Sequence, residues 1–243
     1  MRRALEGIPF GVAVSVAGDR VAGYAQDRAV HGFVWSGGAT QTLPLPADRL
    51  SIVNATNDSS AMVGTYHAPN NESHAFVVSE GALTDLGTLG GSGSAALAIN
   101  SRGDLCGSSE LADGGTHGFV ARSGSSLVDI GVPFGGTSSD ARGIDTTGRV
   151  AANARIGPVS RPFVYLAHLT PDAGETDLLP KTDAGKRYAS AHVAAMASNG
   201  RIAGWAIAPT ESKSQVSCVV WMFDGMTGTH SVAESASRNS SES

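Results

Sequence analysis

The sequence has few charged and few aromatic residues, and both shortages restrict what the protein can do. Charged residues make up 16% of the 243 residues, the net charge is −5, and no run of Lys or Arg exceeds two residues. A surface for nucleic acid needs a basic stripe, so we expect no nucleic-acid partner. Aromatic residues make up only 6%, so the core must be built from Val, Ala, Leu and Ile.

The chain also lacks long apolar runs and closely spaced cysteines. No stretch of about 18 apolar residues is present, which predicts that no segment spans a membrane. The basic first residues are not followed by the apolar segment of a signal peptide, so we expect a cytoplasmic protein. Cys106 and Cys218 lie in separate strand patterns, and we expect two buried free thiols rather than a disulfide.

A repeat dominates what the sequence does contain. The segment His31-Gly32-Phe33-Val34 returns in similar form at His74, His117, Arg161 and Ser217, and these starts lie 43, 43, 44 and 56 residues apart. A period of this size is typical of one propeller blade of four short strands. Because a single blade cannot bury both of its faces, we expect the repeats to pack into one closed domain.

Alternation of apolar and polar residues, with Gly, Asn, Asp and Ser between strands, divides each repeat into four strands. The predicted fold is all-β, a five-bladed β-propeller of four-stranded antiparallel blades over residues 10–234. The first strands are poor in bulky residues, which favours their placement nearest the axis over that of the fourth strands. The predicted blades cover about residues 10–46, 51–87, 94–131, 139–180 and 190–234, with an N-terminal extension at 1–9 and a disordered tail at 235–243.

The second and third repeats resemble a known family. Residues 85–91 (Asp-Leu-Gly-Thr-Leu-Gly-Gly), 98–100 (Ala-Ile-Asn) and 117–119 (His-Gly-Phe) are similar to the HAF repeat, which is named for the sequence found here at residues 74–76. The resemblance covers nearly the whole chain and weakens in the fourth and fifth repeats. It implies a propeller-like fold and an extracellular repeat of unknown role, with no catalytic residues to carry over. The missing export signal speaks against the extracellular setting.

Positions that break the repeat with a polar side chain are better functional candidates than positions that recur. His31, His74 and His117 recur, so we assign them a structural hydrogen bond. Equivalent positions on three blades lie too far apart to share one metal ion. Aligned on the turn that follows, one first-strand position holds Gly11, Ile52, Ala95, Asp140 and His192, and the position two residues on holds Ala13, Asn54, Leu97, Arg142 and Ala194.

The polar members of these two positions form the predicted site. Asp140 and His192 are expected to be neighbours near the axis, with His192 as the acid/base, Asp140 orienting its ring and Arg142 holding a developing negative charge. Variable residues of the same face complete the predicted ligand site, namely Asn54, His67, Glu110, Arg155 and Tyr188. In the structural alternative, Asp140 and Arg142 simply pair with each other. Tyr24, Trp205 and Trp221 are expected to serve packing.

Two functions follow from this reading. The first is an enzyme that acts on a small organic molecule in the central pocket by cyclisation, elimination, isomerisation or hydrolysis, as in a biosynthetic pathway. No phosphate loop, nucleophile elbow or His-Glu-x-x-His motif is present, so we expect neither a metal nor an organic cofactor. The alternative is a non-catalytic binding module for a glycan, peptide or protein partner. The fold cannot decide, because propellers host both roles.

Overall fold

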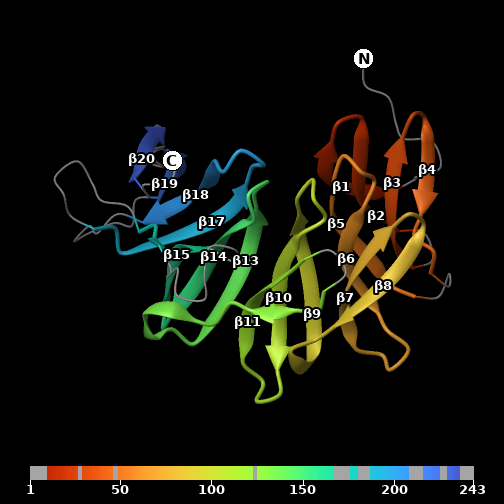
Figure 1. The fold of residues 1–243 in the computed structure, drawn as a ribbon, viewed down its shortest axis with the longest axis horizontal. Helices are drawn as coiled ribbons and strands as arrows, with labels where there is room; N and C mark the ends of the chain where they lie inside the picture. Colours follow the sequence, from red (N-terminus) through yellow and green to blue (C-terminus); the bar gives the residue numbers. More distant parts are fainter. Residues whose placement is uncertain are drawn as a thin grey trace, which may run out of the picture. The chain divides into compact units, whose positions relative to one another are not determined.

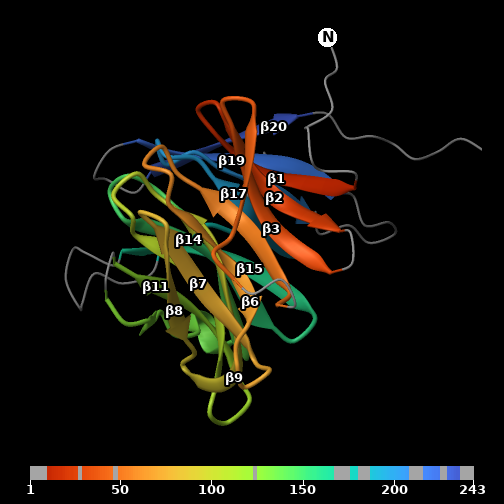
Figure 2. The same ribbon diagram turned by 90° about the vertical axis from the view of Figure 1, so that its right-hand side faces the viewer.

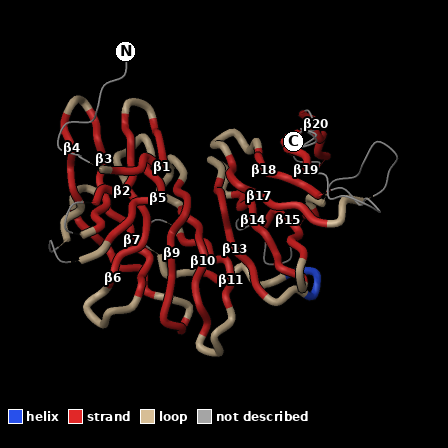
Figure 3. Tube along the Cα trace, turned by 180° about the vertical axis from the view of Figure 1, so that it is seen from behind, coloured by secondary structure: helices blue, strands red, loops and turns tan. Residues whose placement is uncertain are grey.

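A computed structural model describes residues 10–26, 29–45, 49–122, 125–166, 176–179, 187–207, 216–224 and 229–235 (Figure 1). The predicted N-terminal extension at 1–9 and residues 236–243 of the predicted tail lie outside these residues. The chain forms two compact units, Met1–Ile130 and Gly131–Ser243. Strands dominate the described residues (Figure 3), and none of the helices in that part of the chain is long and apolar enough to cross a membrane.

The first unit contains three repeats of four strands each. The first sheet runs in chain order, with β1 (Gly11–Ala17), β2 (Arg20–Gln26) and β3 (Val30–Ser36), which Figure 2 shows side by side, followed by β4 (Ala39–Thr42). The second repeat supplies β5 (Ser51–Thr56), β6 (Met62–His67), β7 (Ser73–Ser79) and β8 (Ala82–Gly87). The third supplies β9 (Gly90–Ile99), β10 (Leu105–Leu111), β11 (Thr116–Ala121) and β12 (Val128–Asp129). A parallel bridge between Ser73 and Gly93 joins these two repeats into one sheet.

The second unit contains the last two repeats, each as a separate antiparallel sheet in chain order. A short 3-10 turn at Pro133–Gly135 precedes them. The fourth repeat supplies β13 (Ser138–Ile144), β14 (Arg149–Ile156), β15 (Val159–Leu166) and β16 (Thr176–Asp177). The fifth supplies β17 (Ser190–Met196), β18 (Ile202–Ile207), β19 (Val216–Asp224) and β20 (Thr229–Ser235). The all-β class predicted from the sequence is therefore confirmed.

Three strands extend beyond the predicted blade ranges, and the fourth strand of the first repeat lies at Ala39–Thr42 rather than at residues 43–45. β9 begins at Gly90 rather than residue 94, because Gly90 pairs with Leu111 and Gly93 bridges to Ser73. β13 begins one residue early, at Ser138, which pairs with Arg155. Ser235 belongs to β20 rather than to the tail, since it pairs with Cys218.

The first strand of every repeat carries a β-bulge at the same place, which bends the strand and re-aims one side chain. In the first repeat, the strand pairing shifts the alignment of first-strand positions derived from the sequence by one residue. Val12, not Gly11, lies opposite Tyr24 in the way that His192 lies opposite Trp205. The residues skipped at the bulges are Val14, Asn54, Leu97, Arg142 and Ala194.

Close backbone approach beside the bulge explains a recurring glycine. A Cβ at Gly64 would lie 1.9 Å from the carbonyl oxygen of Ile52, and a Cβ at Gly204 would lie 1.9 Å from that of His192. Such contacts are far shorter than van der Waals distance, so a side chain there would push the two strands apart.

The core lies where one repeat packs against the next. Val53 of the second repeat is fully buried against Ala22 and Val34 of the first. Val193 of the fifth repeat is buried in the same way against Val164 of the fourth. The aromatic residue of the repeated motif fills this core in four repeats, as Phe33, Phe76, Phe119 and Phe163.

Buried serines also join each repeat to the next by hydrogen bonds. The Ser51 hydroxyl accepts a hydrogen bond from the Gly32 N–H at 3.0 Å, and Ser94 accepts one from Ala75 at 2.7 Å. In the fourth repeat the equivalent position is Pro162, which has no N–H to donate. There the serine of the next repeat, Ser190, accepts from the Ser160 N–H at 2.9 Å and donates to the Ser160 carbonyl at 3.1 Å.

The repeated histidine ties the third strand to the fourth, as predicted. Nδ1 of His74 lies 2.9 Å from the Asp85 carboxylate, and Nδ1 of His117 lies 2.8 Å from that of Asp129. In the fourth repeat Arg161 replaces the histidine and pairs with Asp177. The motif therefore encodes a hydrogen-bonded clamp between a histidine, or Arg161, and a carboxylate, beside a buried aromatic residue.

The prediction for the two cysteines is half right. Neither cysteine forms a disulfide, and Cys106 is buried, but Cys218 is exposed. Its strand alternates between buried Val219 and Trp221 and exposed Val216 and Val220. Cys218 shares the exposed face because side chains two apart point the same way on a strand.

We predict that His74→Asn destabilises the protein more at low pH than at high pH. Burial acts to lower the pKa of His74, but its hydrogen bonds to Asp85 and Glu72 outweigh this and raise the pKa. The raised pKa means that the stabilisation is complete below the unfolded value of about 6.5 and is lost as the pH rises through the folded value. Urea unfolding should show a cost of about 1 kcal/mol near pH 6 that shrinks towards pH 9. A pH-independent difference would contradict this origin.

Candidate functional site

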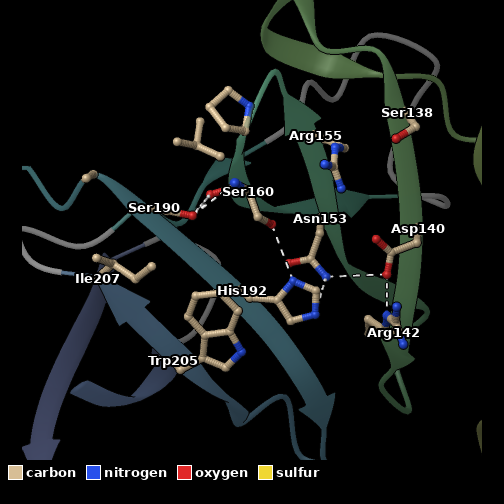
Figure 4. A pocket seen from close by; sticks show the side chains of 13 residues that line it. Ser138, Asp140, Arg142, Asn153, Arg155, Ser160, Ser190, His192, Trp205 and Ile207 are labelled. Atoms are coloured by element: carbon tan, nitrogen blue, oxygen red, sulfur yellow. Dashed lines mark hydrogen bonds and ion pairs between the residues drawn. The ribbon is translucent and has the colours of Figure 1, made fainter. Parts of the chain in front are cut away.

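A pocket of about 540 Å³ in the second unit gathers four of the predicted site residues (Figure 4). Asp140, Arg142, Arg155 and His192 all line it. They come from β13, β14 and β17, strands whose backbones are fixed by their sheets. The structure thus brings together the whole predicted acid/base set and one of the predicted ligand-binding residues.

Two cross-strand pairs at equivalent register positions form the centre of the pocket. Asp140 lies opposite Asn153 in the β13–β14 pair, and His192 lies opposite Trp205 in the β17–β18 pair. The corresponding pairs in the first three repeats combine Val12 with Tyr24, Ile52 with Thr65 and Ala95 with Ser108. Only the fourth and fifth repeats place a carboxylate or an imidazole in this pair.

Asn153 is the hub of the pocket, and sequence reasoning missed it. Its side chain is 2% exposed. Oδ1 accepts the Val193 N–H at 2.7 Å and Nδ2 donates to the Val193 carbonyl at 3.2 Å, which joins β14 to β17. The same amide nitrogen faces Asp140 Oδ2 at 3.4 Å and His192 Nε2 at 3.5 Å. The sequence did contain one sign of its role, because the amide of Asn153 directly follows the apolar residues Val150–Ala152.

His192 is held by neutral groups rather than by a carboxylate. Its ring stacks on Trp205 with centroids 5.4 Å apart and an interplanar angle of 21°. Nδ1 lies 3.3 Å from the Ser160 hydroxyl, and that residue is positioned by Ser190. Burial is the main cause that lowers the pKa of His192, and nearby Arg142 adds to it against the opposing charge of Asp140. The ring is therefore neutral at pH 7.

The Asn153 amide favours one tautomer of His192. The Val193 N–H fixes Oδ1 of Asn153, so the amide NH₂ is the group that faces Nε2, at 3.5 Å. This contact favours Nε2 as the acceptor and the proton on Nδ1, towards Ser160. In that tautomer His192 donates to the Ser160 hydroxyl and does not take its proton.

Asp140 pairs with Arg142 instead of orienting His192. Their side chains form an ion pair and are 27% and 41% exposed. Arg142 occupies the bulge of β13, which turns its side chain back towards Asp140. Asp140 acts on the imidazole as a nearby charge, with the Asn153 amide between them. The pairing follows the structural alternative drawn from the sequence.

Arg155 is the cation left over in this pocket. It lies two residues beyond Asn153 on β14, and its side chain is exposed. Among the residues that the structure describes, no partner for its guanidinium is found, whereas the other arginine of the pocket is paired.

The remaining predicted ligand residues lie elsewhere. Asn54, His67 and Glu110 belong to the first unit. Asn54 donates to the Ala96 carbonyl at 2.9 Å, and Glu110 accepts the Ser92 hydroxyl at 2.6 Å. Tyr188 belongs to the second unit, but it is 4% exposed and packs in the core.

The prediction for the tryptophans is corrected in one case. Trp221 is fully buried, as expected, and donates to the Leu178 carbonyl at 2.8 Å. Trp205 is 36% exposed and lines the pocket, because its position in the second strand faces away from the core. Within the described ranges no group of three His, Cys, Asp or Glu side chains is arranged to hold a metal ion. The pocket offers an aromatic plane, hydroxyls, one amide and guanidinium groups.

Comparison with known proteins identifies the fold class only. No family model and no curated protein matches the chain. TolB from Acinetobacter baumannii has a TM-score of 0.53 and 15% identity, over 94% of this chain and 54% of that one. A mutant Aleuria aurantia lectin in complex with Fucα1-6GlcNAc has a TM-score of 0.45 and 14% identity (93% and 77% covered). A mutant AofleA from Arthrobotrys oligospora has a TM-score of 0.46 and 11% identity, over 89% of this chain and 70% of that one.

The likeness to TolB supports a β-propeller fold for this chain. The chain spans 54% of the TolB length, and the identity of 15% carries nothing about function.

We predict that Asn153→Leu destabilises the second unit by about 3 kcal/mol, because it leaves the Val193 N–H and carbonyl buried without partners. Asn54→Leu is the matched control, since that half-buried amide makes a single bond to the Ala96 carbonyl and should cost about 1 kcal/mol. Urea unfolding of both variants measures the difference. Equal costs would show that Asn153 is not the fastening between β14 and β17.

Proposed function

We propose that the protein is a non-catalytic binding module whose pocket in the second unit binds a glycan. The observation that supports this most is the exposed ring of Trp205, which stacks on His192, beside the fixed amide of Asn153. A sugar ring has an apolar face of C–H groups and a rim of hydroxyls. An exposed aromatic plane suits the face, and a few placed polar groups suit the rim.

The polar groups around the plane match a rim of hydroxyls. Asp140 has an acceptor oxygen on an exposed edge, and the Ser160 hydroxyl accepts and donates. All these groups stand on strands, and Asn153 and Ser190 hold them from buried positions. A rigid site of this kind pays little conformational entropy on binding, which suits weakly binding ligands such as sugars.

Acid/base catalysis on a small organic molecule is the competing function. The contact of 3.3 Å between Ser160 and His192 favours it. Against it stand the tautomer of His192, in which the proton faces Ser160, and the engagement of Asp140 by Arg142. A general base for Ser160 would need the proton on the other ring nitrogen.

The scaffold proposed for this function is a propeller of five four-stranded blades, one for each repeat. Support comes from four antiparallel strands in chain order in every repeat and from the bulge shared by all five first strands. We also propose that the chain is a HAF-repeat protein. The clamp of His74 with Asp85 and the buried Phe76 give the motif a structural reason.

We predict that the purified protein binds glycans on an array and that Trp205→Ala weakens binding at least about tenfold, by removing the plane under the sugar. Tyr24→Ala is the matched control, because Tyr24 has the equivalent register position in the first repeat and does not line this pocket. Calorimetric titration of an array hit measures the affinities. Absence of any hit, or equal binding by both variants, would refute the proposal. Chemical conversion of a hit, detected by mass spectrometry, would support the enzyme instead.

A further inference from the structure

Resting on the proposed function, we propose that the glycan is acidic and that Arg155 binds a carboxylate on the sugar. Arg155 lines the pocket, and its guanidinium has no partner in the described part of the chain. A guanidinium has five N–H donors in a planar fork that matches the two oxygens of a carboxylate. The site therefore contains an unused receptor for a planar anion.

The charges lining the pocket do not cancel. Asp140 and Arg142 form an ion pair and balance each other. His192 is neutral at pH 7, because burial lowers its pKa. Arg155 remains as one positive charge, in a chain whose net charge is −5. A local cation on an acidic protein attracts an anionic ligand and repels a cationic one.

A single negative charge fits this balance better than a double one. Asp140 is held in the pocket by Arg142 and by the Asn153 amide at 3.4 Å, so it stays close to any bound ligand. A phosphate group carries nearly two charges at neutral pH and would be repelled more strongly by this carboxylate. A uronic acid carries one charge, on a planar group, and keeps the ring hydroxyls that the remaining polar groups need.

The position of Arg155 suits a carboxylate at the edge of a sugar ring. Asn153 and Arg155 are two residues apart on β14 and so share one face of the strand. Asn153 sits beside the stacked rings of His192 and Trp205. A ring over that plane thus has a cation at its periphery, towards the end of β14 (Figure 4).

The cation is specific to this repeat. The equivalent second-strand positions in the other repeats hold Gln26, His67, Glu110 and Ile207. The first repeat has a glutamine, Gln26, at this position, so Arg155→Gln should not disturb the fold. The variant therefore tests the positive charge alone. Arg201 lies in the same unit, does not line the pocket, and provides the control Arg201→Gln.

The experiment uses an array of matched pairs, in which glucuronides, galacturonides and mannuronides are compared with the corresponding neutral glycosides. Calorimetry then measures the hits with wild type, Arg155→Gln and Arg201→Gln. We expect an acidic member to bind at least about tenfold tighter than its neutral partner. Arg155→Gln should remove this preference and leave binding of the neutral partner unchanged, while Arg201→Gln should behave as wild type. Added salt should reduce the preference.

The outcomes separate the two proposals. Neutral glycosides that bind as tightly as their acidic partners, or an acidic preference that survives Arg155→Gln, would overturn the acidic ligand and leave the glycan-binding module standing. Binding of no glycan of either kind would overturn the module and the inference together. Circular dichroism of each variant would show that the strands remain folded.

Discussion

The candidate site depends on one buried amide. Asn153 accepts a hydrogen bond from the Val193 N–H at 2.7 Å and donates one to the Val193 carbonyl, so it joins the backbones of two repeats. A buried amide with unmet bonds is costly, and this one is fixed by backbone groups that cannot rotate. Its second hydrogen consequently points in a set direction, towards Asp140 and His192. The seam between the fourth and fifth repeats and the geometry of the pocket are therefore the same structural feature.

The repeats share a scaffold, and the pocket uses the positions at which the scaffold leaves the residue type open. A bulge, a nearby glycine, a buried serine and a clamped carboxylate recur because each meets a requirement of backbone geometry or burial. Register positions that face away from the core carry no such requirement. In the fourth and fifth repeats those positions hold Asp140, His192 and Trp205, whereas Asn153 at the position opposite Asp140 is buried. Pro162 adds a further departure, since its missing N–H leaves Ser190 to hold Ser160 in the pocket.

Much of the fold was predictable from the sequence, because alternation and turn residues are local signals. Even the role of His74 followed from its recurrence. The site was less predictable. That Asp140, Arg142, Arg155 and His192 line one pocket followed from strand phase alone. The role of Asn153 could not be predicted, because an amide in a strand sequence does not indicate which neighbouring backbone groups it will hydrogen-bond. Trp205 and Trp221 look alike in sequence and differ only in which face of the strand they occupy.

The distribution of charge favours binding over catalysis in this pocket. A general base for Ser160 would need an unprotonated ring nitrogen facing the hydroxyl. The fixed amide of Asn153 instead favours the tautomer that has the proton on Nδ1 of His192, which is the nitrogen facing Ser160. The Asp140 charge is balanced within the protein. The pocket presents the stacked rings of His192 and Trp205 with Arg155 beside them, and such a surface could bind a ligand with no proton transfer and little rearrangement.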